Sequence, residues 1–270
     1  MNSTIKNMLA MTWLLGSLVQ VQAWGESDLT NADDIVKQAN RASYYAGKDG
    51  RAEARMKIID SQKHKQIRQF TILRRTRIDD RTQDMLVFIS RPSDVRGMVF
   101  RVVRQPGGDD NRWLYLPGLD LVRQISAGDQ RTSFIGSDFL YEDVSGRDPN
   151  ADTHQILETT KKYYKLKSIP KKSRSVEFSY YTSWIDKKTL LPMKVEYTDI
   201  RGKIYRRMDV KKVTVIQGYP TVLRASISNL DSNSSTTMEM RGVRYDLGLP
   251  ASIFSERSLR TPPTSWLRGK

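Results

Sequence analysis

The feature that most constrains the fold of this chain is an alternation of apolar and charged residues with a period of two. It is clearest in residues 51–58, where the apolar positions are Ala52, Ala54, Met56 and Ile58 and the charged positions are Arg51, Glu53, Arg55 and Lys57. Successive side chains of a β-strand point to opposite faces, so this pattern predicts a strand with one buried face and one face in water. Similar runs, separated by turns rich in Gly, Pro, Asn and Asp, continue to residue 240. The chain is therefore predicted to be mainly β, with antiparallel sheet as its main element.

The predicted strands form one continuous sheet. They are expected at 51–58, 67–78, 85–89 and 98–104, as two short strands in 113–125, and at 153–160, 163–169, 176–186, 191–199, 203–215, 223–227 and 238–240. Residues 85–89 are apolar at every position, so this strand should be covered on both faces. The polar segment 145–150 could be a domain boundary, but the same short-strand pattern on both sides of it favours a single domain. No period of about 20 to 50 residues repeats, which excludes a propeller or a solenoid.

One helix is predicted, at residues 31–43. Asn31 can accept a hydrogen bond from the free N–H groups of the first turn, and Asp33 and Asp34 suit the positive end of the helix dipole. The apolar stripe of this helix consists of Ile35, Val36, Ala39 and Ala42. A glycine-containing segment, 47–50, ends it.

The stretch 113–143 fits neither period throughout. Its first half is expected to turn at Pro117 and Gly118, with the glycine supplying a positive φ for a tight reversal. Residues 134–143 are rich in aromatics but show no strand alternation and no helical stripe. An apolar, irregular segment within a sheet protein must cover something or be covered. We interpret it as a plug or lid over a sheet face; the alternative is a loop that packs on the core.

The first 23 residues have the pattern of a secretory signal peptide. Lys6 is their only charge, an apolar run covers residues 8–19, and Ala23 ends a small-residue cleavage pattern. The run is shorter than the roughly 20 residues that a transmembrane helix needs, and an uncleaved anchor is the alternative. The expected organisation is a signal peptide at 1–23, one domain at 24–260 and a polar C-terminal tail at 261–270.

Charge and cysteine content narrow the classes of function. The chain has no Cys, so its stability should come from an ordinary core and not from disulfides. The formal net charge is +15 and falls to +14 if Lys6 leaves with the signal peptide. After export, anionic lipid headgroups or other envelope polyanions are better candidate partners than nucleic acid, with a generic solvated basic surface as the alternative. We therefore expect no nucleic-acid partner.

No residue pattern supports catalysis. Only His64 and His154 are present, and neither has the spacing of a zinc site. There is no G-x-S-x-G elbow, and of the acidic pairs only Glu142 and Asp143 stand outside a helix cap or turn. We predict no enzymatic activity, no catalytic residue, no metal site and no cofactor.

Five motifs together resemble a known superfamily. They are FISRPSDVRG at 88–97, WLYLP at 113–117, GSDFLYED at 136–143, WIDKKTLLPMKVEY at 184–197 and VRYDLGLP at 243–250. In their order and spacing they resemble the LolA/LolB-like superfamily of periplasmic lipid and lipoprotein carriers, in particular the outer-membrane lipoprotein-sorting branch. The chain departs from the lipoprotein chaperone itself in being longer and more basic.

The resemblance implies a single curved antiparallel sheet that forms an open half-barrel, closed by a helix or loop lid over an apolar cavity. It implies a protein of the Gram-negative periplasm that carries lipid or acylated protein between the two membranes, with an RND-like inner-membrane exporter and an outer-membrane acceptor as candidate partners. The cavity is expected to be lined by Met56, Ile58, Phe70, Ile72, Phe88, Phe100, Trp113, Tyr115, Phe178, Met193 and Val195. The lid is expected to consist of Phe134, Ile135, Phe139, Leu140 and Tyr141.

Two features bear on this hypothesis and on its alternatives. Seven Met remain after residue 23, several on apolar strand faces, where they suit a mobile acyl chain but also serve as ordinary core filler. One alternative is an adaptor that docks on an envelope exporter or assembly machine and carries nothing. The other, an outer-membrane barrel, is disfavoured because the strand faces opposite the apolar ones are rich in Lys, Arg and Glu.

Overall fold

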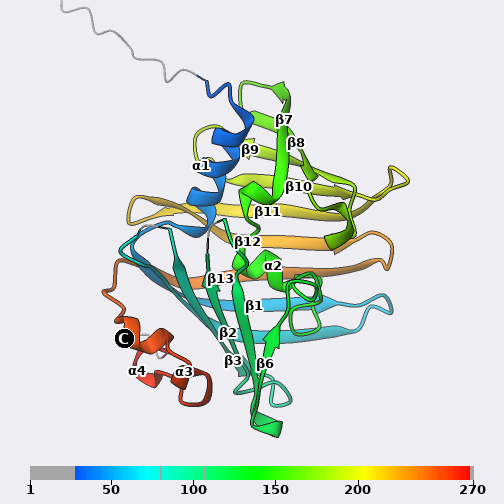
Figure 1. Cartoon of the computed structure of the whole chain (residues 1–270). Helices are drawn as coiled ribbons and strands as arrows, with labels where there is room; N and C mark the ends of the chain where they lie inside the picture. The colour runs from blue at the N-terminus through cyan, green and yellow to red at the C-terminus, as the bar shows by residue number, and fades with distance from the viewer. Residues whose placement is uncertain (1–27, 80, 106, 268–270) are drawn as a thin grey trace, which may run out of the picture.

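The computed structural model of the chain describes residues 28–79, 81–105 and 107–267. Its main element is one antiparallel sheet of 13 strands that is not closed into a barrel, which confirms the predicted fold class (Figure 1). In chain order the strands are β1 (Asp49–Ile59), β2 (Lys65–Thr76), β3 (Gln83–Arg91), β4 (Val99–Arg104), β5 (Asn111–Leu116), β6 (Leu121–Ile125), β7 (Asp152–Thr159), β8 (Tyr163–Pro170), β9 (Tyr180–Asp186), β10 (Pro192–Thr198), β11 (Ile204–Ile216), β12 (Tyr219–Asn229) and β13 (Ser234–Tyr245). The predicted signal peptide lies outside the described residues.

The order of the strands in space decides where the rest of the chain must run. It is β6-β5-β4-β3-β2-β1-β13-β12-β11-β10-β9-β8-β7, so β1 and β13 pair in the middle while β6 and β7 form the two edges. The connection from β6 to β7, residues 126–151, therefore has to cross the whole sheet. We call this segment the plug, and it includes the short helix α2 (Tyr141–Ser145). It crosses the face that also carries α1 (Ala32–Tyr44), which we call the inner face (Figure 1).

Helix α1 forms where the sequence predicts it. The side chain of Asn31 accepts a hydrogen bond from the backbone N–H of Asp34 at 3.1 Å, as an N-cap does. Ile35 and Ala39 are buried against Tyr164, Leu166 and Ile185 of β8 and β9. The apolar stripe of α1 thus covers the inner face near the β7 edge, and it leaves the other strands to be covered by the plug.

The sheet carries an apolar cluster on each face. The inner cluster joins Met56, Phe70, Val87 and Phe100 to residues of the plug. The outer cluster joins Leu73, Leu86, Phe88 and Val99 to the segment that follows β13, with Leu249, Ile253, Phe254 and Leu259. Strand β3 contributes to both clusters, which agrees with the prediction that it is covered on both sides.

The C-terminal segment accounts for one wrong prediction. It contains α3 (Arg257–Arg260) and α4 (Thr264–Leu267), and Trp266 and Leu267 of α4 pack against the outer cluster. Arg51 was expected to face water, but its side chain donates hydrogen bonds to the carbonyl oxygens of Trp266 at 3.0 Å and Leu267 at 2.7 Å and is only 6% exposed. The boundary between the domain and the C-terminal tail at residue 260 stays a prediction, although α4, which lies beyond it, packs on the sheet.

Two turns differ in detail from the expectation. Between β5 and β6 the positive φ of 43° belongs to Asp120 and not to Gly118, because Pro117–Leu119 forms a 3₁₀ turn that delays the reversal. The carboxylate of Asp120 accepts hydrogen bonds from Tyr115 and Arg260, and Asp tolerates this conformation better than most residues. Strand β9 begins at Tyr180 instead of residue 176, and the preceding Phe178 is buried against the rings of Tyr181 and Tyr197.

The docking of the C-terminal segment predicts the effect of one truncation in the outer cluster. Leu259 is 1% exposed, so Leu259→Ala should lower the free energy of unfolding by about 2–4 kcal/mol through lost burial and a residual cavity. Leu230, which is 42% exposed, is the matched control, and Leu230→Ala should change the free energy of unfolding by less than about 0.5 kcal/mol. Urea unfolding followed by tryptophan fluorescence measures both. Equal effects of the two substitutions would show that the segment does not pack on the sheet.

Candidate functional site

The plug buries an aromatic group in the inner face. Phe134 is fully buried, and its ring lies 5.9 Å from that of Phe70, 5.7 Å from that of Phe100 and 5.5 Å from that of Tyr141. The segment reverses at Ile135 and Gly136, which both have positive φ, and the N–H of Phe134 then donates to the carbonyl of Phe139 at 2.7 Å. A β-branched residue such as Ile rarely takes this conformation, so the local backbone is held by its surroundings. The expected lid residues Phe134, Ile135, Phe139 and Tyr141 thus lie in the core, and Leu140 is half-buried.

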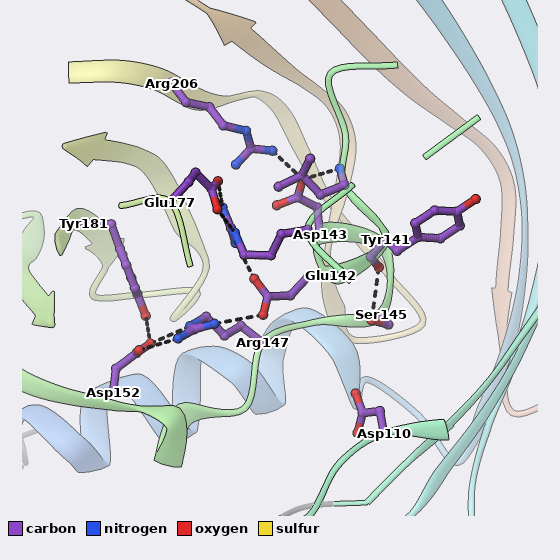
Figure 2. A network of polar contacts seen from close by, with 12 residues as sticks. Asp110, Tyr141, Glu142, Asp143, Ser145, Arg147, Asp152, Glu177, Tyr181 and Arg206 are labelled. Atoms are coloured by element: carbon purple, nitrogen blue, oxygen red, sulfur yellow. Dashed lines mark hydrogen bonds and ion pairs between the residues drawn. The ribbon is translucent and has the colours of Figure 1, made fainter. Parts of the chain in front are cut away.

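A network of buried charges attaches the plug to the other half of the sheet (Figure 2). Glu142 accepts from Arg131 and, at 2.8 Å, from Arg147. Asp143 accepts from Arg206 of β11 and from the N–H of Leu140. Arg147 continues the network to Asp152 at the start of β7, where Tyr181 also donates, at 2.9 Å. The acidic pair Glu142–Asp143, the one pair that the sequence left without a structural role, is therefore the centre of this network.

The electrostatics of the network favour its charged form. Burial opposes the charge of Arg131, but its hydrogen bonds to Glu177 and the charge of Glu142 raise its pKa above the ordinary value. Burial likewise acts against the Glu177 carboxylate, but the hydrogen bonds from Arg131 hold its pKa below 4.5. The guanidinium of Arg131 also lies over the rings of Phe178 and Tyr197, at 4.8 and 5.4 Å. Since each of these carboxylates is paired with arginine, the network acts as a fastening and offers no free general base.

A cavity of about 300 Å³ lies between the C-terminal end of α1, the plug and the inner faces of β1, β2 and β11–β13. We call it the central cavity; it is partly open to solvent. Its walls are mostly apolar and include Ile72, Met85, Met208, Val210, Val222, Met238, Met240 and Val243. The plug contributes Phe139 and Val144, and the polar residues on its wall include Arg74, Gln83 and Asp143.

The central cavity exists because the strands beneath it carry small side chains. Gly50 pairs with Arg74 on one side and Tyr245 on the other, and Ala52 pairs with Ile72. A Cβ atom added at Gly50 would lie 3.2 Å from both the Tyr245 ring and the Arg244 carbonyl oxygen and 3.4 Å from the Arg74 guanidinium, so neighbouring groups already occupy the space over this glycine. The small side chains on the wall that leave space are Ala52 of β1 and Ala225 of β12.

Most of the residues expected to line a cavity are not on the wall of the central cavity. Of the expected residues, Ile72 and the lid residue Phe139 are on this wall. Met56, Phe70 and Phe100 fill the inner cluster, and Ile58 is buried on the same face of β1 as Met56. Phe178 packs in the charged network, Val195 borders a smaller cavity of about 130 Å³ beneath α1, and Met193 is half-buried.

Three expected lining residues lie on the other side of the sheet. Phe88, Trp113 and Tyr115 belong to the outer cluster, because they have the opposite strand parity to Val87 and Leu114 of the inner cluster. We expected large aromatic residues to line the cavity, but large side chains fill space whereas small ones leave it open. The informative signal was the run of small residues on the apolar face of β1, Gly50, Ala52 and Ala54.

Both histidines have structural contacts. His64 contacts the Asp60 carboxylate at 3.1 Å, and His154 contacts the Ser168 hydroxyl and the Pro149 carbonyl at 2.8 and 2.9 Å. In the part of the chain that the structure describes, no group of three or more His, Cys, Asp or Glu could hold a metal ion. Over the same residues, no helix has the length and apolar character to cross a bilayer. Absence of enzymatic activity stays a prediction.

Solved structures define the class of this protein as a LolA-like fold. A DUF1329 family protein from Desulfovibrio piger is 26% identical, covers 84% of this chain and 97% of its own, and superposes with a TM-score of 0.77. A putative outer membrane lipoprotein-sorting protein domain from Vibrio parahaemolyticus is 23% identical over 85% of this chain and 98% of its own, also with a TM-score of 0.77. A LolA superfamily protein from Nitrosomonas europaea is 16% identical over 85% and 99%, with a TM-score of 0.63.

Family membership follows from the sequence. A family model described as that of an uncharacterized protein matches residues 81–261, more than half of the chain, and the chain belongs to that family. The LolA-like fold that the resemblance implies is confirmed by the solved structures. No curated protein matches the sequence.

Removing one carboxylate tests whether the network fastens the plug. Asp143→Asn leaves Arg206 of β11 buried without this partner, and breaking a buried pair in this way costs about 3–5 kcal/mol. The control is Glu158→Gln at the exposed pair with Lys165, 3.9 Å apart, which should cost less than about 1 kcal/mol. Denaturant unfolding measures both changes, and a loss as small as the control's would contradict the fastening role.

The pKa of Glu177 predicts a pH dependence. Because its folded-state pKa lies below the ordinary 4.5, the carboxylate stabilises the fold above that pH, and the contribution is lost as the pH falls through the lowered value. Wild type should therefore have a higher Tm than Glu177→Gln at pH 7, with a difference that narrows as the pH is lowered below about 4.5. A difference that stays constant over this range would be inconsistent with the ion pair to Arg131.

Proposed function

We propose that this protein is a periplasmic carrier that binds an acyl chain of a lipid or lipoprotein in the central cavity. The observation that carries the proposal is an apolar hollow on the inner face that the side chains of the chain itself leave unfilled. Three methionines, Met208, Met238 and Met240, are on its wall. Met is unbranched and polarizable, so it adapts to a flexible apolar partner.

The size of the cavity sets the amount of ligand. If each methylene takes roughly the 30 Å³ of a liquid water molecule, the volume corresponds to on the order of ten methylenes. Burying a methylene contributes about 0.8 kcal/mol, so ten of them contribute about 8 kcal/mol before the costs of association are subtracted. That is sufficient for reversible binding, which a carrier between two membranes requires.

The fold comparison supports the rest of the proposal. The lipoprotein-sorting name of the Vibrio parahaemolyticus domain supports a location in the periplasm and lipid or acylated protein as cargo. An inner-membrane exporter and an outer-membrane acceptor remain the proposed partners. If the segment 134–141 is a lid, its opening has to pull the adjoining Asp143 away from Arg206 of β11, so cargo reaches the cavity more readily through its open side.

An adaptor that carries no cargo is the second candidate. The observation that favours it is the extent to which the plug and α1 already fill the inner face, from the aromatic group around Phe134 to the contacts of Ile35. The two candidates differ in whether the central cavity is ever occupied.

Filling the cavity distinguishes the two candidates. Ala225 lies on the cavity wall, and Ala225→Phe should weaken binding of a fluorescent acyl probe at least tenfold by occupying the space. Ser226→Phe is the matched control, because Ser226 follows Ala225 in β12 and therefore points to the outer face. This variant should bind the probe with a Kd within twofold of that of the wild type. Fluorescence titration measures both, and circular dichroism confirms that each variant folds. Absence of probe binding to the wild-type protein would contradict the carrier proposal.

A further inference from the structure

The wall of the central cavity contains a half-buried cation, Arg74, that has no acidic partner among the described residues. Arg74, on the inner face of β2, donates to the backbone carbonyl oxygens of Tyr44, at 2.8 Å, and Ala46 at the end of α1. A guanidinium has five N–H donors, so three remain after these two bonds. The remaining contact is with the ring of Tyr245, 5.8 Å from the guanidinium carbon.

The carboxylates whose charges act on Arg74 are engaged elsewhere. Asp49 accepts the N–H groups of Leu247 and Leu249 at 2.7 and 2.8 Å, and Asp246 accepts from the N–H of Lys48 at 2.7 Å. Among the described residues, neither forms an ion pair with Arg74. Burial lowers the pKa of Arg74, in keeping with a charge that the protein compensates incompletely. Asp143, the acid on the cavity wall, is paired with Arg206.

The local geometry leaves room for an anion beside this guanidinium. The central cavity reaches this guanidinium, because Arg74 and Tyr245 are both on its wall, on strands that flank Gly50 of β1. Gln83, also on the wall, donates its amide to the Tyr44 carbonyl, which adds no negative charge. The apolar wall formed by Met238 and Met240 is part of the same cavity.

We propose that the central cavity selects single-chain amphiphiles with an anionic head group, and that Arg74 binds the head group while the chain lies along Met208, Met238 and Met240. This inference rests on the proposed carrier function and narrows its ligand. The shared chemistry is a carboxylate or a phosphate monoester, both of which match the planar donors of arginine. A cation without a counter-charge in the protein favours such a ligand over a neutral alcohol of the same chain length, because the ligand supplies the missing charge.

The test is a competition series on wild-type protein. Decanoate, decyl phosphate and 1-decanol are titrated against the uncharged probe N-phenyl-1-naphthylamine at pH 8. At least one of the two anions should displace the probe at a concentration at least tenfold below that of 1-decanol, and the stronger of the two identifies the head group. If 1-decanol displaces the probe as well as both anions do, the proposed selectivity is wrong while the carrier function stands. If nothing binds, the carrier proposal itself fails.

Two variants assign the selectivity to Arg74. Arg74→Met should reduce the preference for the anion to less than twofold and leave displacement by 1-decanol unchanged. Arg104→Met is the matched control, because Arg104 also lies beside the end of α1, with its guanidinium carbon 5.1 Å from the centre of the Tyr44 ring, but is not on the cavity wall. It should keep the full preference. Thermal unfolding verifies both folds, and an anion preference that survives in Arg74→Met would overturn the assignment.

Discussion

An open sheet of 13 strands has an apolar inner face that something else in the chain must cover, and this constraint organises the molecule. The strand order places β6 and β7 at opposite edges, so the connection between them has to cross that face. Phe134 then fills one half of it, and the ion pairs of Asp143 with Arg206 of β11 and of Arg147 with Asp152 of β7 attach the same segment to the other half. Helix α1 covers the strands near β7.

The central cavity is what this covering leaves open. It lies where the plug and α1 meet above a floor that includes the small side chains of Ala52 and Ala225. The wall is mostly apolar, with methionines on neighbouring strands, and Arg74 provides a cation that has no acidic partner among the described residues beside the end of α1. The size, wall chemistry and charge of the cavity all favour the ligand that we propose, an acyl chain with an acidic head group.

Much of the fold could be predicted from local pattern, whereas the site could not. The alternation at Ala52, Ala54 and Met56 depends only on the period of a strand, and the Asn31 cap depends on neighbouring residues, so both were predictable. The pairing of β1 with β13 joins residues about 190 positions apart, and the ion pair between Arg206 and Asp143 depends on that arrangement. Phe88 and Trp113 were placed on the wrong face because an apolar residue does not reveal which of two covered faces it occupies.

The central claim is that the cavity holds an acyl chain when the protein is in its own compartment. Native mass spectrometry of protein purified gently from a bacterial periplasm, followed by organic extraction and lipid analysis, tests it most directly. We predict a mass above that of the polypeptide, and extraction should release a molecule whose acyl chain the cavity had held. Protein that carries no extra mass, and from which no acyl compound is extracted, would contradict it.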